Sequence, residues 1–250
     1  MSGHSKWSTI KRKKGAIDAK RGKIFSKLIK EISMAAREGG GDPETNIRLK
    51  NAIEKGRANN MPVDNIERAL KRATGADADA ATWEEITYEG YGPGSVALLI
   101  EALTDNKNRT AADIRHIFSR AGGRLGGLGS VSYLFTRKGL IQVSKEKYDE
   151  EKIFEAAIEA GAENVEDGGE THEVYTNYAE LEKVKSALIK QGIKFESAES
   201  IMVPSTTVKV KGKEAQSMLK MVEMLEDNDD VQNVWANFDI DIEEMEAFHG

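Results

Sequence analysis

The order of strand-like and helix-like segments between residues 137 and 204 constrains the fold more than any other feature of the sequence. Short runs of β-branched and other apolar residues give way twice to segments in which apolar residues recur at helical spacing. The resulting order is β-α-β-β-α-β, the split βαβ or ferredoxin-like order. The expected strands are 140–143, 164–166, 173–176 and 194–203, and the expected helices are 150–160 and 179–191.

The segments on either side of this stretch need one another. The three elements that follow Pro204 are too few to bury a core alone. We therefore expect residues 80–136 and 205–240 to form one discontinuous α/β domain, with 137–204 inserted as a ferredoxin-like domain and 241–250 left as an acidic tail. The expected strands of the discontinuous domain are 85–91, 95–103, 131–135, 206–210 and 231–238, and its expected helices are 110–121 and 212–225.

The first part of the chain has helical spacing only. Residues 16–37 carry apolar side chains on one stripe, and Gly39 begins a glycine run that ends the helix. Asp42 and Pro43 predict the start of a second helix, with Asp42 as its N-cap. Pro62 opens a third helix, and alternating Ala and Asp at 76–80 indicate a linker. The prediction is an α+β protein of three domains, with residues 1–79 forming a basic arm and a three-helix domain, followed by two ferredoxin-like α/β domains, one inserted in the other.

Charge is divided between the two parts of the chain. Residues 1–72 hold 18 Lys and Arg against 8 Asp and Glu, a balance of +10, and the remainder holds 18 against 34, a balance of −16, which together give the net charge of −6. A basic segment on an acidic body is typical of a protein that binds a polyanion. The alternative is that the basic helices are solvated faces that dock on the acidic body.

The basic arm is the first candidate site for nucleic acid. Its Lys and Arg side chains would neutralise phosphates, and Trp7 would stack on an exposed base. Trp7 has an alternative role as a hydrophobic anchor that packs the arm onto the body. The candidate residues of the arm are Lys6, Trp7, Lys11, Arg12, Lys13, Lys14, Lys20, Arg21, Lys23 and Lys27.

The second candidate site lies between an expected strand end and an expected helix N-terminus, where backbone amides favour an anion. Thr110 and Asp113 have capping-box spacing there. The alternative is a polar turn with a cap, and the glycines of the loop 122–129 are read as a tight turn. The residues of this second site are Asn106, Lys107, Asn108, Arg109 and Thr110.

Signals for other functions are poor. The chain has no Cys, and its four His are dispersed, so we expect no thiolate chemistry, no metal, no cofactor and no enzymatic activity. Acidic clusters, such as 227–230, are read as solvated turns. The sequence contains no run of eighteen apolar residues and no secretory signal. We expect a cytoplasmic protein with no membrane partner and no small-molecule substrate; the pattern indicates no oligomeric state.

Several motifs resemble those of the YebC/PmpR family over nearly the whole chain. They include GHSKW and KRGKIFSKLIKEI near the start, and GGGDPETN before the second helix. YEGYGPGSVALLIEALTDNKNRTAADIRHIFSRAGG, GSVSYLF, IMVPST and MLEDNDDVQNVW follow in order. The resemblance implies a helical N-terminal domain and two α/β domains, one inserted in the other.

The resemblance also implies a function. It points to a DNA-binding transcriptional regulator. The family is related to mitochondrial translational activators, so the alternative is a ribosome-associated translation factor that binds rRNA or tRNA and relieves stalling at proline-rich stretches.

Overall fold

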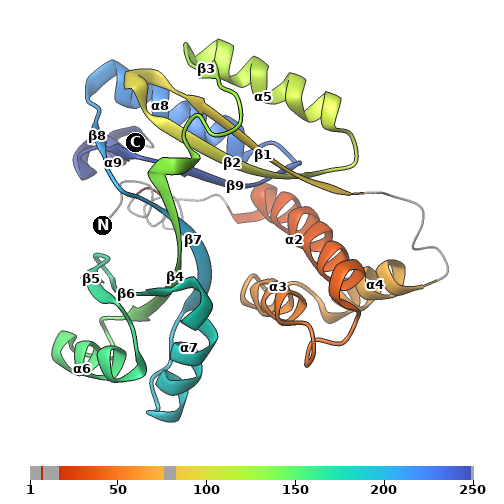
Figure 1. The fold of residues 1–250 in the computed structure, drawn as a ribbon, viewed down its shortest axis with the longest axis vertical. Coiled ribbons are helices and arrows are strands. Elements are labelled where there is room, and N and C mark those ends of the chain that lie inside the picture. Colours follow the sequence, from red (N-terminus) through yellow and green to blue (C-terminus); the bar gives the residue numbers. More distant parts are fainter. Residues whose placement is uncertain (1–6, 8–16, 76–82, 249–250) are drawn as a thin grey trace.

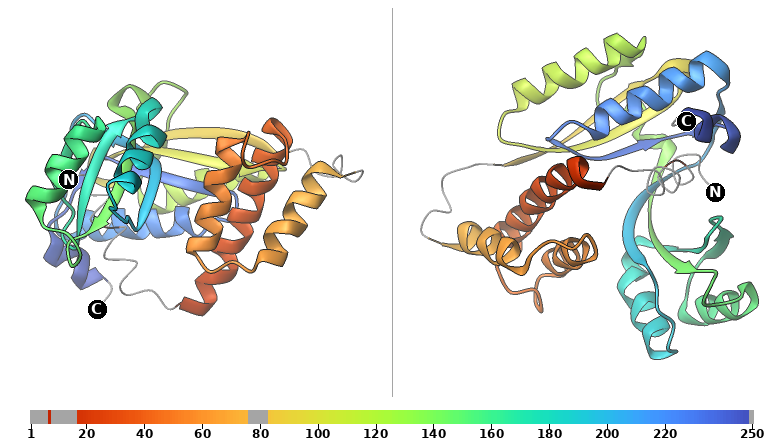
Figure 2. Two further views of the ribbon diagram at one scale, coloured as in Figure 1. Left: turned by 90° about the horizontal axis from the view of Figure 1, so that it is seen from below. Right: turned by 180° about the vertical axis from the view of Figure 1, so that it is seen from behind.

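The computed structural model describes residue 7 and residues 17–75 and 83–248, with only the backbone of 17–20 (Figure 1). Predictions that fall on residues 1–6, 8–16 and 76–82 lie outside this part, including most of the basic arm and the linker. The described chain forms a helical unit, a central unit with helices on one face of a sheet, and a unit that hangs below it on two long strands (Figures 1 and 2). No helix in the described residues is long and apolar enough to cross a membrane.

The helical unit contains three helices around one small core. Leu28 and Ile32 pack against Leu49, Ile53 and other buried residues. These positions recur three or four residues apart, so one stripe of each helix faces the core. The helices are α2 (Ile17–Gly39), α3 (Ile47–Ala58) and α4 (Val63–Thr74).

The predicted start of the second helix is wrong. Asp42 caps no helix, because its Oδ1 accepts a hydrogen bond from the amide of Glu44 at 3.0 Å and closes a turn. Asn46 is the N-cap of α3, and its Oδ1 accepts from the amide of Leu49 at 3.0 Å. The Nδ2 of Asn46 also donates to the carbonyl of Ala35 at 2.7 Å, which joins the end of α2 to the start of α3.

The central unit is an antiparallel sheet in the order β3-β1-β2-β9, with α5 and α8 packed on one face (Figure 1). Its core lies between the strands and the two helices, and it includes Leu98, Ile100, Phe118 and Met218. The elements are β1 (Glu84–Tyr91), β2 (Ala97–Thr104), α5 (Lys107–Ala121), β3 (Arg124–Leu125), α8 (Gly212–Glu226) and β9 (Val231–Ala236). A small parallel pair, β8 (Val208–Lys209) with β10 (Phe238–Asp239), lies beside them.

The inserted unit confirms the β-α-β-β-α-β order. Its four strands pair antiparallel in the order β5-β6-β4-β7, the ferredoxin-like strand order, and α6 and α7 cover one face. Its elements are β4 (Phe135–Ser144), α6 (Glu150–Ala160), β5 (Asn164–Asp167), β6 (Thr171–Asn177), α7 (Leu181–Lys190) and β7 (Ser197–Pro204). The exact domain boundaries at 136 and 204 stay a prediction.

One of the expected strands is a turn, and the next strand is longer than predicted. The predicted strands at 131–135 and 140–143 are replaced by a 3-10 turn at Ser132–Leu134 and by the single strand β4. Gly139, which directly precedes the expected strand at 140–143, lies inside β4, where a Cβ would clash with the Thr176 hydroxyl. A glycine in the middle of a strand marks close packing here and does not end the strand.

The predicted acidic tail is also wrong in part. Residues Ile242–Phe248 form the helix α9, and Met245 is fully buried on its inner face. Phe248 lies one turn further along the same side, where its ring meets that of Trp7 with centroids 5.7 Å apart. Two apolar side chains on one side of a charged helix were too few to show a helical period in the sequence.

Candidate nucleic-acid interface

The lysines of α2 meet the carboxyl end of α8. Lys23 Nζ donates to the carbonyl of Asp227 at 3.1 Å, and Lys27 Nζ donates to the carbonyl of Glu226 at 2.5 Å. Lys30, one turn further along α2, reaches the carbonyl of Asp229 at 2.9 Å. The three lysines form one stripe because their spacing of four and three residues brings them to the same side of a helix.

This contact satisfies groups that a helix cannot satisfy by itself. The last carbonyls of a helix have no partner inside it, and the helix dipole makes that end negative. Lys23 and Lys27 supply both the donors and the positive charge at the end of α8. Lys23 and Lys27 therefore bind another part of the protein, as the alternative of basic helices docked on the acidic body predicts.

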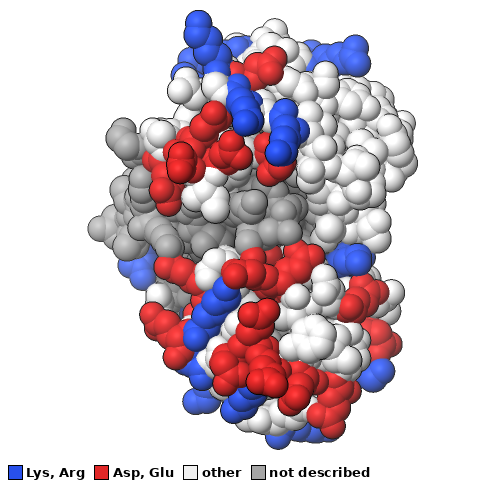
Figure 3. Space-filling model, turned by 90° about the vertical axis from the view of Figure 1, so that its left-hand side faces the viewer, with Lys and Arg blue, Asp and Glu red and all other residues white. Residues whose placement is uncertain are grey.

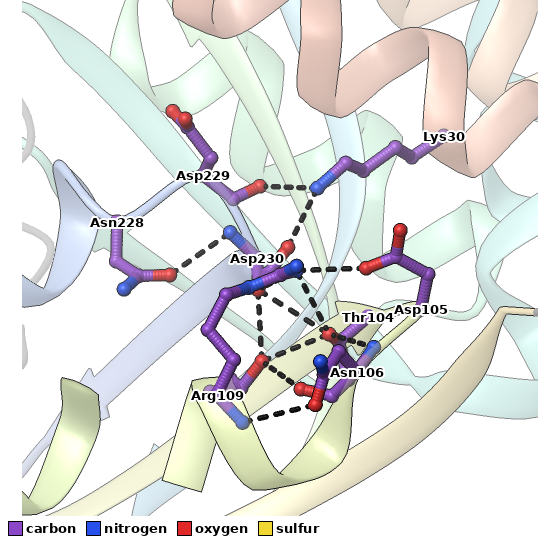
Figure 4. A network of polar contacts seen from close by, with 9 residues as sticks. Lys30, Thr104, Asp105, Asn106, Arg109, Asn228, Asp229 and Asp230 are labelled. Atoms are coloured by element: carbon purple, nitrogen blue, oxygen red, sulfur yellow. Dashed lines mark hydrogen bonds and ion pairs between the residues drawn. The ribbon is translucent and has the colours of Figure 1, made fainter. Parts of the chain in front are cut away.

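Asp230 is the centre of the polar network drawn in Figure 4, and its side chain is only 6% exposed. Its Oδ1 accepts from Lys30 Nζ at 2.8 Å. Its Oδ2 accepts from Arg109 Nη2 at 2.7 Å and from the Thr110 hydroxyl at 2.8 Å. The Thr104 hydroxyl lies 3.3 Å from the same oxygen. One carboxylate therefore joins α2, the end of β2, α5 and the start of β9.

The surroundings of Asp230 keep it ionised. Burial by itself would raise the pKa of Asp230, but hydrogen bonds from Lys30, Arg109 and Thr110 outweigh burial and lower the pKa to about 2. The hydrogen bond to Asp230, with a second one to Asp105, raises the pKa of Arg109 above its ordinary value. This ion pair stays charged at every physiological pH.

The second candidate site proves to be a capped helix start that already holds an anion. The Asn106 side chain is the N-cap of α5 and accepts from the amide of Arg109 at 3.1 Å. The expected capping box is wrong, because Thr110 lies inside α5, buried against Asp230. Lys107 Nζ lies 3.5 Å from Glu84 at the surface, and Asn108 is exposed. The carboxylate of Asp230 already binds Arg109 and Thr110, two of the side chains predicted to contact an external anion.

Trp7 is buried in the core of the central unit and is not presented for base stacking. Its exposed fraction is 0%, and it belongs to the same cluster as Phe238 and Met245. The edge-to-face contact with Phe248 adds α9 to this packing. Trp7 is a hydrophobic anchor in this structure, as its alternative role describes, and base stacking by Trp7 stays a prediction.

The remaining arm residues are only partly visible. Lys20 belongs to α2, and the guanidinium of Arg21 lies 5.9 Å from the centre of the Phe25 ring in an exposed position. The other arm residues lie outside the described residues, so their role stays a prediction: Lys6, Lys11, Arg12, Lys13 and Lys14.

A buried carboxylate, which the sequence analysis did not identify, holds the glycine-rich loop. Glu89 accepts from the amides of Gly129 at 2.8 Å, Val131 at 2.7 Å and Ser132 at 2.9 Å. Burial by itself would raise the pKa of Glu89, but these amide hydrogen bonds lower it overall. Glu89 fixes the backbone of the loop, and two large side chains nearby face solvent. Leu128 is 87% exposed and Tyr133 is 72% exposed.

The described surface carries acidic regions as well as basic ones. Figure 3 shows Asp and Glu side chains gathered over the lower part of one face, where the inserted unit lies, and Lys and Arg side chains at the top. Within the described residues no group of three or more His, Cys, Asp or Glu is arranged to hold a metal ion.

The fold and these surfaces define a class: a three-part α+β protein whose basic N-terminal helices dock on an acidic body. A family model described as the TACO1/YebC protein N-terminal domain matches residues 5–76, and one described as the TACO1/YebC second and third domain matches residues 83–238. The chain belongs to the TACO1/YebC family.

Curated relatives and a solved structure agree with this assignment. A protein of Geobacter sulfurreducens is 58% identical over 98% of this chain and 99% of its own, and one of Syntrophotalea carbinolica is 57% identical over the full length of both. Both carry the name "Probable transcriptional regulatory protein". The crystal structure of a conserved hypothetical protein from Aquifex aeolicus is 49% identical, with a TM-score of 0.83 over 90% of this chain and 93% of that one.

Proposed function

We propose that this protein is a regulator that binds nucleic acid and performs no covalent chemistry. The observation that carries the proposal is the division of charge, with +10 on residues 1–72 and −16 on the remainder. Lys and Arg bind phosphates by releasing condensed counterions, so a segment of this kind binds a nucleic acid without base specificity. The names of the relatives support a role in the regulation of transcription. The partner in this proposal is DNA.

The contact in this proposal is made first by the arm before α2. Lys23 and Lys27 hold α2 on the end of α8, so they contribute to docking before they contribute to binding. The clusters that remain for phosphates are Lys11, Arg12, Lys13 and Lys14, together with Lys6, Lys20 and Arg21.

The test is a competition between DNA sequences at near-physiological salt. Fluorescence anisotropy with a labelled promoter duplex, competed by random duplex of the same length, separates a regulator of chosen genes from a general polyanion binder. Replacing Lys11, Arg12, Lys13 and Lys14 with Ala should weaken binding and flatten its salt slope by about one unit per lost phosphate contact. An unchanged slope would show that the arm is not the contact surface.

A translation factor on the ribosome is the second candidate, and one exposed aromatic residue favours it. Tyr133 stands 72% exposed beside the loop that Glu89 holds. Unpaired RNA bases stack on exposed aromatic rings, whereas the bases of a DNA duplex are not available for such contacts. Under this candidate the partner is rRNA or tRNA, and the effect is relief of stalling at proline-rich stretches.

Sedimentation separates the two candidates. Tagged protein in lysate is run on a sucrose gradient at near-physiological salt, as the wild type and with Lys11, Arg12, Lys13 and Lys14 replaced by Ala. Migration with ribosomes that depends on those residues supports the translation factor. Migration at the top of the gradient with both forms, including in lysates that contain stalled ribosomes, counts against it and leaves DNA as the partner.

A further inference from the structure

We propose that the groove between α5 and α8 is a second nucleic-acid contact, a subsite for a stretch of phosphodiester backbone. The inference rests on the proposed function and adds a surface that lies outside the basic arm. The groove encloses about 220 Å³. Its lining residues are Arg120, Ala121, Ser217, Lys220, Met221 and Met224.

The two helices build this groove from neighbouring turns. Ser217, Lys220 and Met224 follow one another at spacings of three and four residues, so they form a stripe on one side of α8. Arg120 stands in the last turn of α5, on the opposite wall. The helices pack against each other over the sheet and form the outer layer of the central unit (Figures 1 and 2).

The charged side chains that line the groove are positive and are not neutralised within the described chain. Arg120 and Lys220 are both exposed, and neither has an ion-pair or hydrogen-bond partner in the described chain. The lining contains no Asp or Glu among the described residues. The lysines at the other end of α8 differ, because Lys23 and Lys27 are held by its last carbonyls.

The lining chemistry fits a nucleic-acid backbone. The guanidinium of Arg120 can bind two phosphate oxygens at once, and Lys220 adds a second positive charge. The exposed hydroxyl of Ser217 is a further donor between them. The half-buried Met224 gives an apolar floor that can adapt to a sugar or a base, and the buried Met221 lies beside it. A cation on each wall, with an exposed rim between them, fits a phosphodiester backbone that passes along the groove.

The test compares two double variants of the full-length protein with equal changes of charge. The groove variant is Arg120→Gln with Lys220→Gln. The control is Lys190→Gln with Lys194→Gln, which removes two exposed cations of the inserted unit that also lack a partner in the described chain. Binding to a labelled single-stranded RNA and to a DNA duplex is measured by fluorescence anisotropy over a series of salt concentrations.

We expect the groove variant to bind RNA roughly tenfold more weakly than the control near 0.1 M salt. Its salt slope should be shallower by about 1.4, since each phosphate contact on a single strand contributes about 0.7. Thermal unfolding should be the same for both variants because the replaced side chains are exposed. Should the groove variant unfold, Ser217→Asp keeps both cations, replaces one hydroxyl donor with a negative charge at the exposed rim, and should weaken binding.

The outcomes are distinguishable. Equal affinity and slope for the groove and control variants, with binding by the wild-type protein intact, would overturn the groove alone. Failure of the wild-type protein to bind either polymer would overturn the proposed function, and the groove with it. A loss of affinity confined to the groove variant and to Ser217→Asp supports the subsite.

Discussion

The Nζ atom of Lys30 lies 2.8 Å from Oδ1 of Asp230, although two hundred residues separate the two in the chain. Lys30 also lies 4.9 Å from the centre of the Trp83 ring. Through Asp230 the helical unit is connected to Arg109 and Thr110 of α5 (Figure 4). Asp230 therefore adds a buried ion pair to the contacts by which Lys23 and Lys27 hold α2 on the end of α8.

Asp230→Asn should lower the free energy of unfolding by about 2 kcal/mol, because Lys30 and Arg109 lose the charge that they share. Urea unfolding at pH 7 measures this. Asp229→Asn is the matched control, since its side chain is exposed and its backbone carbonyl still holds Lys30. Equal stability of the two variants would show that the Asp230 network adds nothing.

The contribution of Asp230 should disappear in acid. The folded pKa of about 2 lies below the ordinary 3.8, so the stabilisation is complete above about pH 4 and is lost as the pH falls toward 2. Other carboxylates titrate in the same range, so the quantity to measure is the difference in unfolding free energy between wild type and Asp230→Asn. This difference should shrink between pH 5 and pH 2.5. A constant difference would contradict the lowered pKa.

Trp7→Ala should lower the free energy of unfolding by about 3–5 kcal/mol, since it empties a site in the main core. Trp7→Phe keeps an aromatic ring in contact with Phe248 and should lose less. Thermal or urea unfolding of both variants checks this. Loss of nucleic-acid binding by Trp7→Ala at full stability would favour base stacking over the buried anchor.

Lys23→Gln with Lys27→Gln should affect stability more than binding. The two side chains hold the last carbonyls of α8, so their loss should cost about 0.3–1 kcal/mol each. The salt slope of nucleic-acid binding should stay the same. Lys50→Gln, an exposed change in α3, controls for the lost charge. A shallower salt slope of binding with unchanged stability would show that both lysines contact nucleic acid.

Glu89→Gln should loosen the glycine-rich loop without unfolding the sheet. The amide group of Gln would place two donors among three backbone amides, so the loop amides of Gly129, Val131 and Ser132 lose acceptors. Hydrogen exchange at these amides should become faster. Glu196→Gln, at an exposed position of the inserted unit, should leave the exchange rates of the loop unchanged.

The hydrophobic periods of the sequence predicted most of the helices and strands. The errors arose where two residues could cap one helix or where packing came from a distant part of the chain. The inserted unit was predicted element by element because its apolar residues alternate as strands and helices require. The start of α3 was misplaced because Asp42 and Asn46 are both good caps, and only the turn made by Asp42 selects Asn46. The start of β4 was predicted too late, at residue 140, because the packing that requires a glycine at Gly139 comes from Thr176, far along the chain.

The candidate site was less predictable because its contacts are long-range. The charge pattern identified the lysines of α2, but no local signal shows that Lys27 meets the end of α8. Asp230 looked like one more acid in a solvated turn, and its burial depends on Arg109 and Lys30 from other parts of the chain. Glu89 stands in a strand, and its partners follow about forty residues later.

The long pair of strands that carries the inserted unit has an architectural consequence. Thr136 pairs with Val203 and Arg137 with Met202, so the chain enters and leaves the inserted unit through adjacent positions of one antiparallel ladder. The chain between Arg137 and Met202 therefore has the position of the loop in a β-hairpin of the central unit. A tight turn joining Arg137 to Met202 should close that hairpin, so we expect removal of the unit to keep the path of the remaining chain and to cost the ion pair of Lys185 with Glu54.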